Sequence, residues 1–315
     1  MEYSSDTNAQ VAYVTNASGS ESITQSQETN NAHSGSVWGT GPGGFSQSFI
    51  VDNTNPITKF TLNLYKSTGA TGTLTAYIYN DNGSGKPGTS LATFSNMAVN
   101  DLTTNKADYN FLGTYTPVIS TVYYIVLIWT GGTNGDRLDM GINTAGGYSG
   151  GYSVLEEDGI WYSFTSYDTD FDIYQTFPPV FQSYSESTIK TQGSYSLKGI
   201  AAITDSLNKT LTRTIGSTIN LSGISQIKFD IYSSRTGSNI KLGIHDSGGV
   251  TTEITPNILS ANTWQEVKIN LQNVINTNKD VIDSIIITVV NADAANTFYL
   301  DNMFGYYIPN IMMVN

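Results

Sequence analysis

The stretch IDSIIITVVNADAANTFYLDNMFGYY, Ile282 to Tyr307, decides the fold of this chain. Two apolar runs flank a polar turn, and the second run contains the tripeptide Leu300-Asp301-Asn302. In an earlier segment, QIKFDIY, apolar residues alternate with polar ones, which is typical of a strand with one buried face. Short apolar runs separated by polar turns recur along the chain. We therefore predict an all-β protein.

Composition supports the same fold class. Charged residues make up only 13% of the chain, which has 30 Gly and 20 Tyr among 315 residues, whereas long amphipathic helices need more Ala, Glu, Lys and Leu. The run VYYIVLIW, Val122 to Trp129, is apolar throughout and is predicted to be a central strand covered on both faces. The segment LEEDGIWYSF, Leu155 to Phe164, has an Asp-Gly pair between two strand-like runs, which predicts a hairpin.

The domain boundary is expected at Phe177-Pro178-Pro179-Val180, because consecutive prolines cannot join a strand ladder. We predict two tandem antiparallel β-sandwich domains, jelly-roll-like in architecture. The first covers residues 1–177 and begins with a polar arm. A linker at 178–180 leads to the second domain at 181–308, and an apolar tail follows at 309–315.

Charge and cysteine content exclude several kinds of function. The net charge is -12 and no cluster of Lys and Arg stands out, so nucleic-acid binding is not expected. There is no cysteine, which rules out disulfides and thiolate chemistry, and no apolar run of membrane-spanning length. The start, MEYSSDTNAQ, lacks the pattern of a signal peptide. We expect an extracellular or virion-surface location, reached by export or by release of a virion at lysis.

Catalytic patterns are weak. His245-Asp246-Ser247 contains the residue types of a triad, but neighbours on a strand point to opposite faces. The acidic run Glu156-Glu157-Asp158 is explained by a solvated hairpin turn. A pair of carboxylates facing each other across a cleft stays open as an alternative. We predict that the protein is not an enzyme.

Three segments carry a resemblance to a known family: the opening stretch, SSRTGSNIKLGIHDSGG (Ser233 to Gly249) and NTWQEVKINL (Asn262 to Leu271). Together they resemble the carbohydrate-binding-module-like, galactose-binding-like jelly rolls of secreted glycan-binding proteins and phage virions. The resemblance covers about Ser183 to Tyr307. The first domain is similar, through its strand and turn pattern, to choice-of-anchor-type surface β-sandwiches.

This resemblance implies a structural Ca²⁺. In such jelly rolls an Asp of the final strand, here Asp301, commonly binds Ca²⁺ together with an acidic residue near the start of the domain, here Glu186. Carboxylate oxygens suit this hard cation. The alternative is that Asp301 only accepts hydrogen bonds from a turn.

Flat aromatic rings that pack on sugar faces provide the candidate glycan site. Tyr232 lies on the polar face of its predicted strand, and Trp38, Trp161 and Tyr162 lie in loops or at strand ends of the first domain. Trp264 matches a position that is usually in the core of the resembled family.

Two roles follow from these observations. The favoured one is a non-catalytic virion structural, decoration or appendage protein of the head-fibre or tail type, which could attach to host glycans. The alternative is a secreted or cell-surface carbohydrate-binding module or adhesin. Expected partners are glycans or other virion or cell-surface proteins. The apolar end IPNIMMVN, Ile308 to Asn315, could dock on a partner or on a second subunit of a homo-oligomer.

Overall fold

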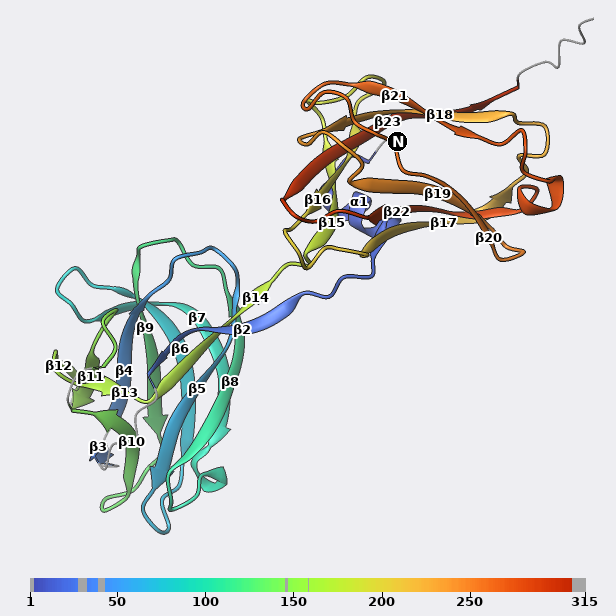
Figure 1. Cartoon of the computed structure of the whole chain (residues 1–315). Coiled ribbons are helices and arrows are strands. Elements are labelled where there is room, and N and C mark those ends of the chain that lie inside the picture. Colours follow the sequence, from blue (N-terminus) through green and yellow to red (C-terminus); the bar gives the residue numbers. More distant parts are fainter. Residues whose placement is uncertain (1–2, 28–32, 39–42, 145–146, 158, 308–315) are drawn as a thin grey trace, which may run out of the picture. The chain divides into compact units, whose positions relative to one another are not determined.

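The computed structural model describes residues 3–27, 33–38, 43–144, 147–157 and 159–307. The chain forms two compact units (Figure 1). One unit, the N-terminal sandwich, is Ser20–Phe177, and the other, the C-terminal sandwich, combines Met1–Gly19 with Pro178–Asn315. Strands dominate both units, so the predicted all-β class is confirmed.

The division between the units differs from the expected one at its N-terminal end. The sequence placed residues 1–177 in one domain, but residues up to Gly19 belong to the C-terminal sandwich. The physical reason is a short strand pairing, in which Val14 lies opposite Thr212, together with the burial of Tyr13 in the core of that unit. The second boundary, between Phe177 and Pro178, lies where the two prolines predict it. The expected tail at 309–315 lies outside the described residues.

The N-terminal sandwich has two sheets, here named sheet B and sheet C. Sheet B has the order β13-β10-β5-β14-β2, with β3 also on β10 and β8 also on β5. Sheet C has the order β12-β11-β4-β9-β6-β7. The strands of sheet B are β2 Ser20–Gln27, β3 His33–Trp38, β5 Ile57–Lys66, β8 Ala107–Tyr115, β10 Arg137–Asn143, β13 Asp168–Thr169 and β14 Phe171–Phe177. Those of sheet C are β4 Gly43–Ile50, β6 Thr73–Asp81, β7 Pro87–Ala98, β9 Val122–Thr130, β11 Ser153–Glu157 and β12 Ile160–Phe164, and a 3₁₀ turn, η1, covers Val99–Asp101.

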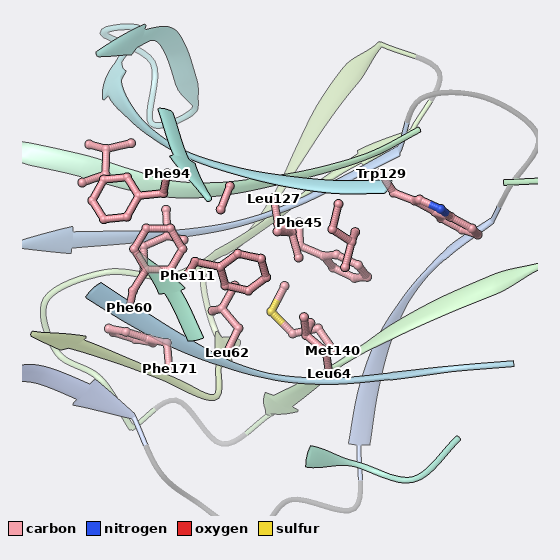
Figure 2. Close-up of a cluster of buried hydrophobic side chains, with 14 of the residues drawn as sticks. Phe45, Phe60, Leu62, Leu64, Phe94, Phe111, Leu127, Trp129, Met140 and Phe171 are labelled. Atoms are coloured by element: carbon pink, nitrogen blue, oxygen red, sulfur yellow. The ribbon is translucent and has the colours of Figure 1, made fainter. Parts of the chain in front are cut away.

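Aromatic rings fill much of the core between these sheets (Figure 2). The Phe60 ring lies 4.7 Å from that of Phe94 and 5.7 Å from that of Phe111, measured between centroids. Strand β9 is buried on both faces: Leu127 belongs to this core, whereas Val126 belongs to a second apolar cluster on the other face of sheet C. The both-sided burial predicted for VYYIVLIW is confirmed.

The C-terminal sandwich also has two sheets, named sheet A and sheet D. Sheet A has the order β1-β17-β22-β19-β20, and sheet D has the order β15-β16-β23-β18-β21. The strands of sheet A are β1 Val14–Thr15, β17 Thr210–Ile219, β19 Ile240–Asp246, β20 Val250–Ile254 and β22 Ile282–Val289. Those of sheet D are β15 Phe181–Glu186, β16 Ser196–Ala201, β18 Gln226–Ser233, β21 Gln265–Asn270 and β23 Asn296–Tyr306, and a 3₁₀ turn, η2, covers Asn276–Asn278.

The stretch that decides the fold supplies one central strand to each sheet of this sandwich. β22 lies between β17 and β19, and β23 lies between β16 and β18. The polar turn that joins them therefore carries the chain from one sheet to the other. Ile287 and Phe298 are both fully buried in the core between the sheets.

A short helix, α1 (Asp6–Ala12), packs on β15 of the same sandwich. The Ser183 hydroxyl donates to the carbonyl oxygens of Ala9 (3.1 Å) and Tyr13 (3.3 Å), and the Asp6 carboxylate accepts from the Ser185 N–H (2.9 Å). The segment predicted from the sequence to be a polar arm therefore contributes buried residues, among them Ala9 and Tyr13, to the core of the C-terminal sandwich. No helix within the described ranges is long and apolar enough to cross a membrane.

Candidate functional site

The face of sheet D that is turned away from the core carries an ordered set of side chains. Along β18, Phe229 and Ile231 enter the core, so Asp230 and Tyr232 point to the other face. Strand pairing places Tyr232 opposite Tyr299 of β23, and Tyr299 opposite Lys198 of β16. The row extends to Tyr184 of β15, which lies opposite Lys198. We call Tyr184, Lys198, Tyr299 and Tyr232, together with Trp264 just before β21, the aromatic row.

Ring contacts hold the aromatic row together. The Tyr232 ring meets Trp264 edge-on, with centroids 5.6 Å apart, and meets Tyr299 edge-on at 5.4 Å. The Lys198 ammonium lies 6.0 Å from the centre of the Tyr299 ring. Tyr232 and Trp264 are half-buried, so each keeps part of its ring open to solvent. Tyr299 is 8% exposed, and this burial raises the pKa of its phenol.

Carboxylates form the next row of the same face. Asp230 lies opposite Asp301 on one side and Glu266 on the other. The Glu266 carboxylate lies 3.1 Å from the ammonium groups of both Lys268 and Lys228, and these contacts lower its pKa. Oxygen acceptors and ammonium donors thus flank the rings. A face of this kind can pack against an apolar ring surface and hydrogen-bond to hydroxyl groups at the same time.

Glu186 and Asp301 hold one loop beside this face. A Glu186 carboxylate oxygen accepts from the N–H groups of Thr188 (2.6 Å) and Ile189 (3.3 Å). Burial raises the pKa of Glu186, but these hydrogen bonds outweigh it and the pKa is lowered overall. Asp301, 1% exposed, accepts from the N–H groups of Thr191 (2.7 Å) and Gln192 (2.9 Å) through one oxygen. Its other oxygen accepts from the Asn302 N–H at 2.8 Å.

These contacts are those of the alternative in which Asp301 hydrogen-bonds a turn. N–H donors converge on the carboxylate oxygens that a cation would need, and such donors repel positive charge. Within the described ranges no three His, Cys, Asp or Glu side chains come together as a metal site. Ca²⁺ binding through Asp301 and Glu186 stays a prediction.

The other predicted sugar-contacting residues lie in the N-terminal sandwich. Trp38, on β3, is 54% exposed, and the Arg137 guanidinium lies 5.9 Å from the centre of its ring. Trp161 and Tyr162 are neighbours on β12 and so point to opposite faces. Trp161 packs against the apolar cluster around Val126 on sheet C, whereas Tyr162 is 47% exposed. None of the three belongs to the aromatic row.

The structure corrects two other expectations. Trp264, expected in the core, is half-buried and joins the aromatic row. It directly precedes Gln265, which lies opposite Ile231 at the start of β21, and its ring contacts that of Tyr232. Glu156, expected in a solvated turn, lies in β11 and is only 9% exposed. The hairpin itself is confirmed, since β11 pairs with β12.

Sequence reasoning missed Tyr299, Lys198 and Tyr184. For Tyr299 a signal exists: in TFYLDN the large apolar residues Phe298 and Leu300 alternate with Tyr299 and Asp301, which places the latter two on the open face. His245 and Asp246 have different partners, as expected for neighbours that point to opposite faces of a strand. Its imidazole lies 2.8 Å from the Asp283 carboxylate, whereas the adjacent Asp246 is 1% exposed and binds turn N–H groups.

Comparison with known proteins finds no matching family model and no curated protein that matches this chain. Solved structures that match this chain in part include an exo-β-agarase, with 14% identity, a TM-score of 0.35, and coverage of 42% of this chain and 23% of that one. They include the family 30 carbohydrate-binding module of a Clostridium thermocellum cellulosomal cellulase, with 16% identity, a TM-score of 0.34, and coverage of 42% of this chain and 88% of that one. The match to a tandem pair of family 22 carbohydrate-binding modules from Paenibacillus barcinonensis covers 93% of each chain, at 11% identity and a TM-score of 0.27. At TM-scores below 0.5, these matches assign neither a family nor a function.

Proposed function

We propose that this chain is a non-catalytic glycan-binding protein and that the aromatic row of sheet D, with its flanking carboxylates, is the binding face. The observation that carries the proposal is the arrangement of Tyr232 between Tyr299 and Trp264, with centroids 5.4 and 5.6 Å apart, outside the core. Tyr232 and Trp264 are half-buried, and their rings provide apolar surface on which the apolar faces of sugars can pack. Asp230 and Glu266 in the next row can accept hydrogen bonds from sugar hydroxyls.

The net charge of the chain favours an uncharged glycan. The aromatic row and the row beside it carry Glu186, Asp230, Glu266 and Asp301, which are partly offset by Lys198, Lys228 and Lys268. The chain as a whole has a net charge of -12. Acidic polysaccharides would be repelled by this charge. A neutral polysaccharide meets no such penalty.

The proposal of a non-catalytic role is supported by the state of Asp301. Asp230 and Asp301 are directly opposite each other, and such pairs of carboxylates carry out glycoside hydrolysis when both face the substrate. Asp301 is 1% exposed, and both of its oxygens accept main-chain N–H groups. It therefore holds a loop and does not face a substrate.

Binding of neutral soluble polysaccharides by the full chain tests the proposal, measured by affinity electrophoresis and calorimetry. Trp264→Ala and Tyr232→Ala should each weaken binding by about tenfold or more, or about 1.4 kcal/mol. Trp38→Ala is the matched control, since this exposed ring belongs to the other sandwich and should leave binding unchanged. Binding that is lost with Trp38→Ala but kept with Trp264→Ala would place the site elsewhere, and release of reducing sugars would show an enzyme.

The virion role that the sequence favours draws in part on the apolar tail Ile308–Asn315, which lies outside the described residues. It stays a prediction, as does the extracellular or virion-surface location. Both are compatible with glycan binding, because an appendage that attaches to a host glycan needs such a face. The geometry of sheet D favours the glycan-binding role that the sequence leaves as the alternative.

A further inference from the structure

Strand β12 ends sheet C without a strand on its other edge. The sheet order ends at β12, which pairs with β11 from Ser153 opposite Phe164 to Glu157 opposite Ile160. The second edge of β12 pairs with no other strand in the described part of the chain. Such an edge presents main-chain N–H and C=O groups that match another strand.

The side chains of β12 do nothing to protect this edge. The strand IWYSF contains no charged residue and no proline. Proteins usually shield an edge with charges, with proline or by making the edge strand very short. Most other strands with an open edge have one of these features: β1 and β13 have two residues each, β7 begins at Pro87, and charges lie in β2 (Glu21), β15 (Glu186), β20 (Glu253) and β21 (Glu266 and Lys268). The exception is β3, HSGSVW, which pairs with β10 alone among the described strands and has neither an acidic or basic charge nor a proline.

Large apolar side chains of β12 are also exposed on one face. Ile160, Tyr162 and Phe164 alternate along the strand and are 52%, 47% and 36% exposed. The ring of Phe164 stacks on Tyr167, with centroids 5.7 Å apart and an interplanar angle of 5°. On the other face Trp161 packs on sheet C and the Ser163 hydroxyl donates to the Gly85 carbonyl (3.2 Å).

We propose that β12 pairs antiparallel with β12 of a second copy of this chain, with Tyr162 on the two-fold axis. The sequence of the strand is self-complementary in this register, because Ile160 of one copy then lies opposite Phe164 of the other. Three apolar side chains from each copy cover one another, and no like charges meet across the pair. A two-fold pairing uses the open edge of both copies and therefore closes at a dimer. This inference does not depend on glycan binding.

The cysteine-free chain allows a direct test of the register. In an antiparallel pair, opposite Cα atoms are about 4.5 or 5.5 Å apart, which is within disulfide reach. Tyr162→Cys should therefore form a covalent dimer in mild oxidant. Ile160→Cys and Phe164→Cys should not, because each lies roughly 14 Å from its own mate. Equal cross-linking of all three variants, or none with Tyr162→Cys, would overturn the register.

The oligomeric state of the full chain, measured by light scattering over a range of concentrations, tests the interface itself. We expect a dimer for the wild type and a monomer for Tyr162→Lys, which places two ammonium groups opposite each other. Leu112→Lys is the matched control, since Leu112 is 61% exposed on β8 of the same sandwich, and it should stay dimeric. A wild-type monomer, a dimer that survives Tyr162→Lys, or open-ended assembly would each contradict the proposal. Circular dichroism of each variant checks that the fold is kept.

Discussion

At the scale of single residues, Asp301 is expected to stabilise the C-terminal sandwich. Asp301→Ala removes the acceptor of the Thr191 and Gln192 N–H groups, and unpaired buried donors cost about 1–3 kcal/mol. Chemical denaturation of the C-terminal sandwich should show this loss. Asp205→Ala, at an exposed aspartate of the same unit, should lie within about 0.5 kcal/mol of wild type.

The effect of Ca²⁺ on stability distinguishes the two interpretations of Asp301, as a Ca²⁺ ligand or as a hydrogen-bond acceptor for a turn. If hydrogen bonds alone explain the residue, Asp301→Ala should destabilise the protein as much in chelator as in Ca²⁺. A melting temperature that rises with Ca²⁺ in the wild type, but not in Asp301→Ala, would instead support the predicted cation site, because a ligand stabilises the state that binds it.

Glu186 should make the stability of the C-terminal sandwich depend on pH in the acidic range. Its pKa is lowered in the folded protein by the hydrogen bonds from Thr188 and Ile189, against the opposing effect of burial. A lowered folded pKa gives stability that is present above the unfolded value, about 4.3, and is lost as pH falls through the folded value. We expect the melting temperature to fall below about pH 4.3, and to fall less steeply in Glu186→Gln. Equal slopes in both proteins would show that Glu186 does not contribute.

At the scale of elements, α1 and β1 should behave as part of the C-terminal sandwich. Tyr13 is 1% exposed, packs edge-on against Tyr3 with centroids 6.0 Å apart, and belongs to the core of that unit. Tyr13→Ala should destabilise the C-terminal sandwich by about 3–5 kcal/mol, as for other large buried aromatic side chains. Val11→Ala is the control on the same helix, since Val11 is 75% exposed. Similar unfolding curves for the two variants would contradict the docking of α1.

At the scale of the whole molecule, the two units should unfold separately, because each has a core of its own. Residues 20–177 are contiguous and should fold alone with the melting transition they show in the full chain. Residues 178–315 alone lack α1 and β1 and should be less stable than the same unit in the full chain. Calorimetry of the two fragments and of the full chain tests this. A fragment 178–315 as stable as in the full chain would show that the N-terminal segment contributes nothing.

The sequence by itself determined the strand class and much of the strand placement, because burial on one face leaves an alternation that can be read directly. This holds for Ile227, Phe229 and Ile231, for the both-sided burial of Val122–Trp129 and for the boundary at Pro178. Alternation also placed Tyr232 on the open face. These features depend on neighbours along the chain.

Only the tertiary structure decided which strands lie side by side, since the pairing of distant segments leaves no local pattern. It placed residues 3–19 on the C-terminal sandwich, across more than 160 positions of sequence, and brought Trp264 and Tyr299 to either side of Tyr232. It also placed β12 at the end of a sheet, with its uncharged edge open. The candidate glycan site and the candidate dimer interface both follow from such pairings.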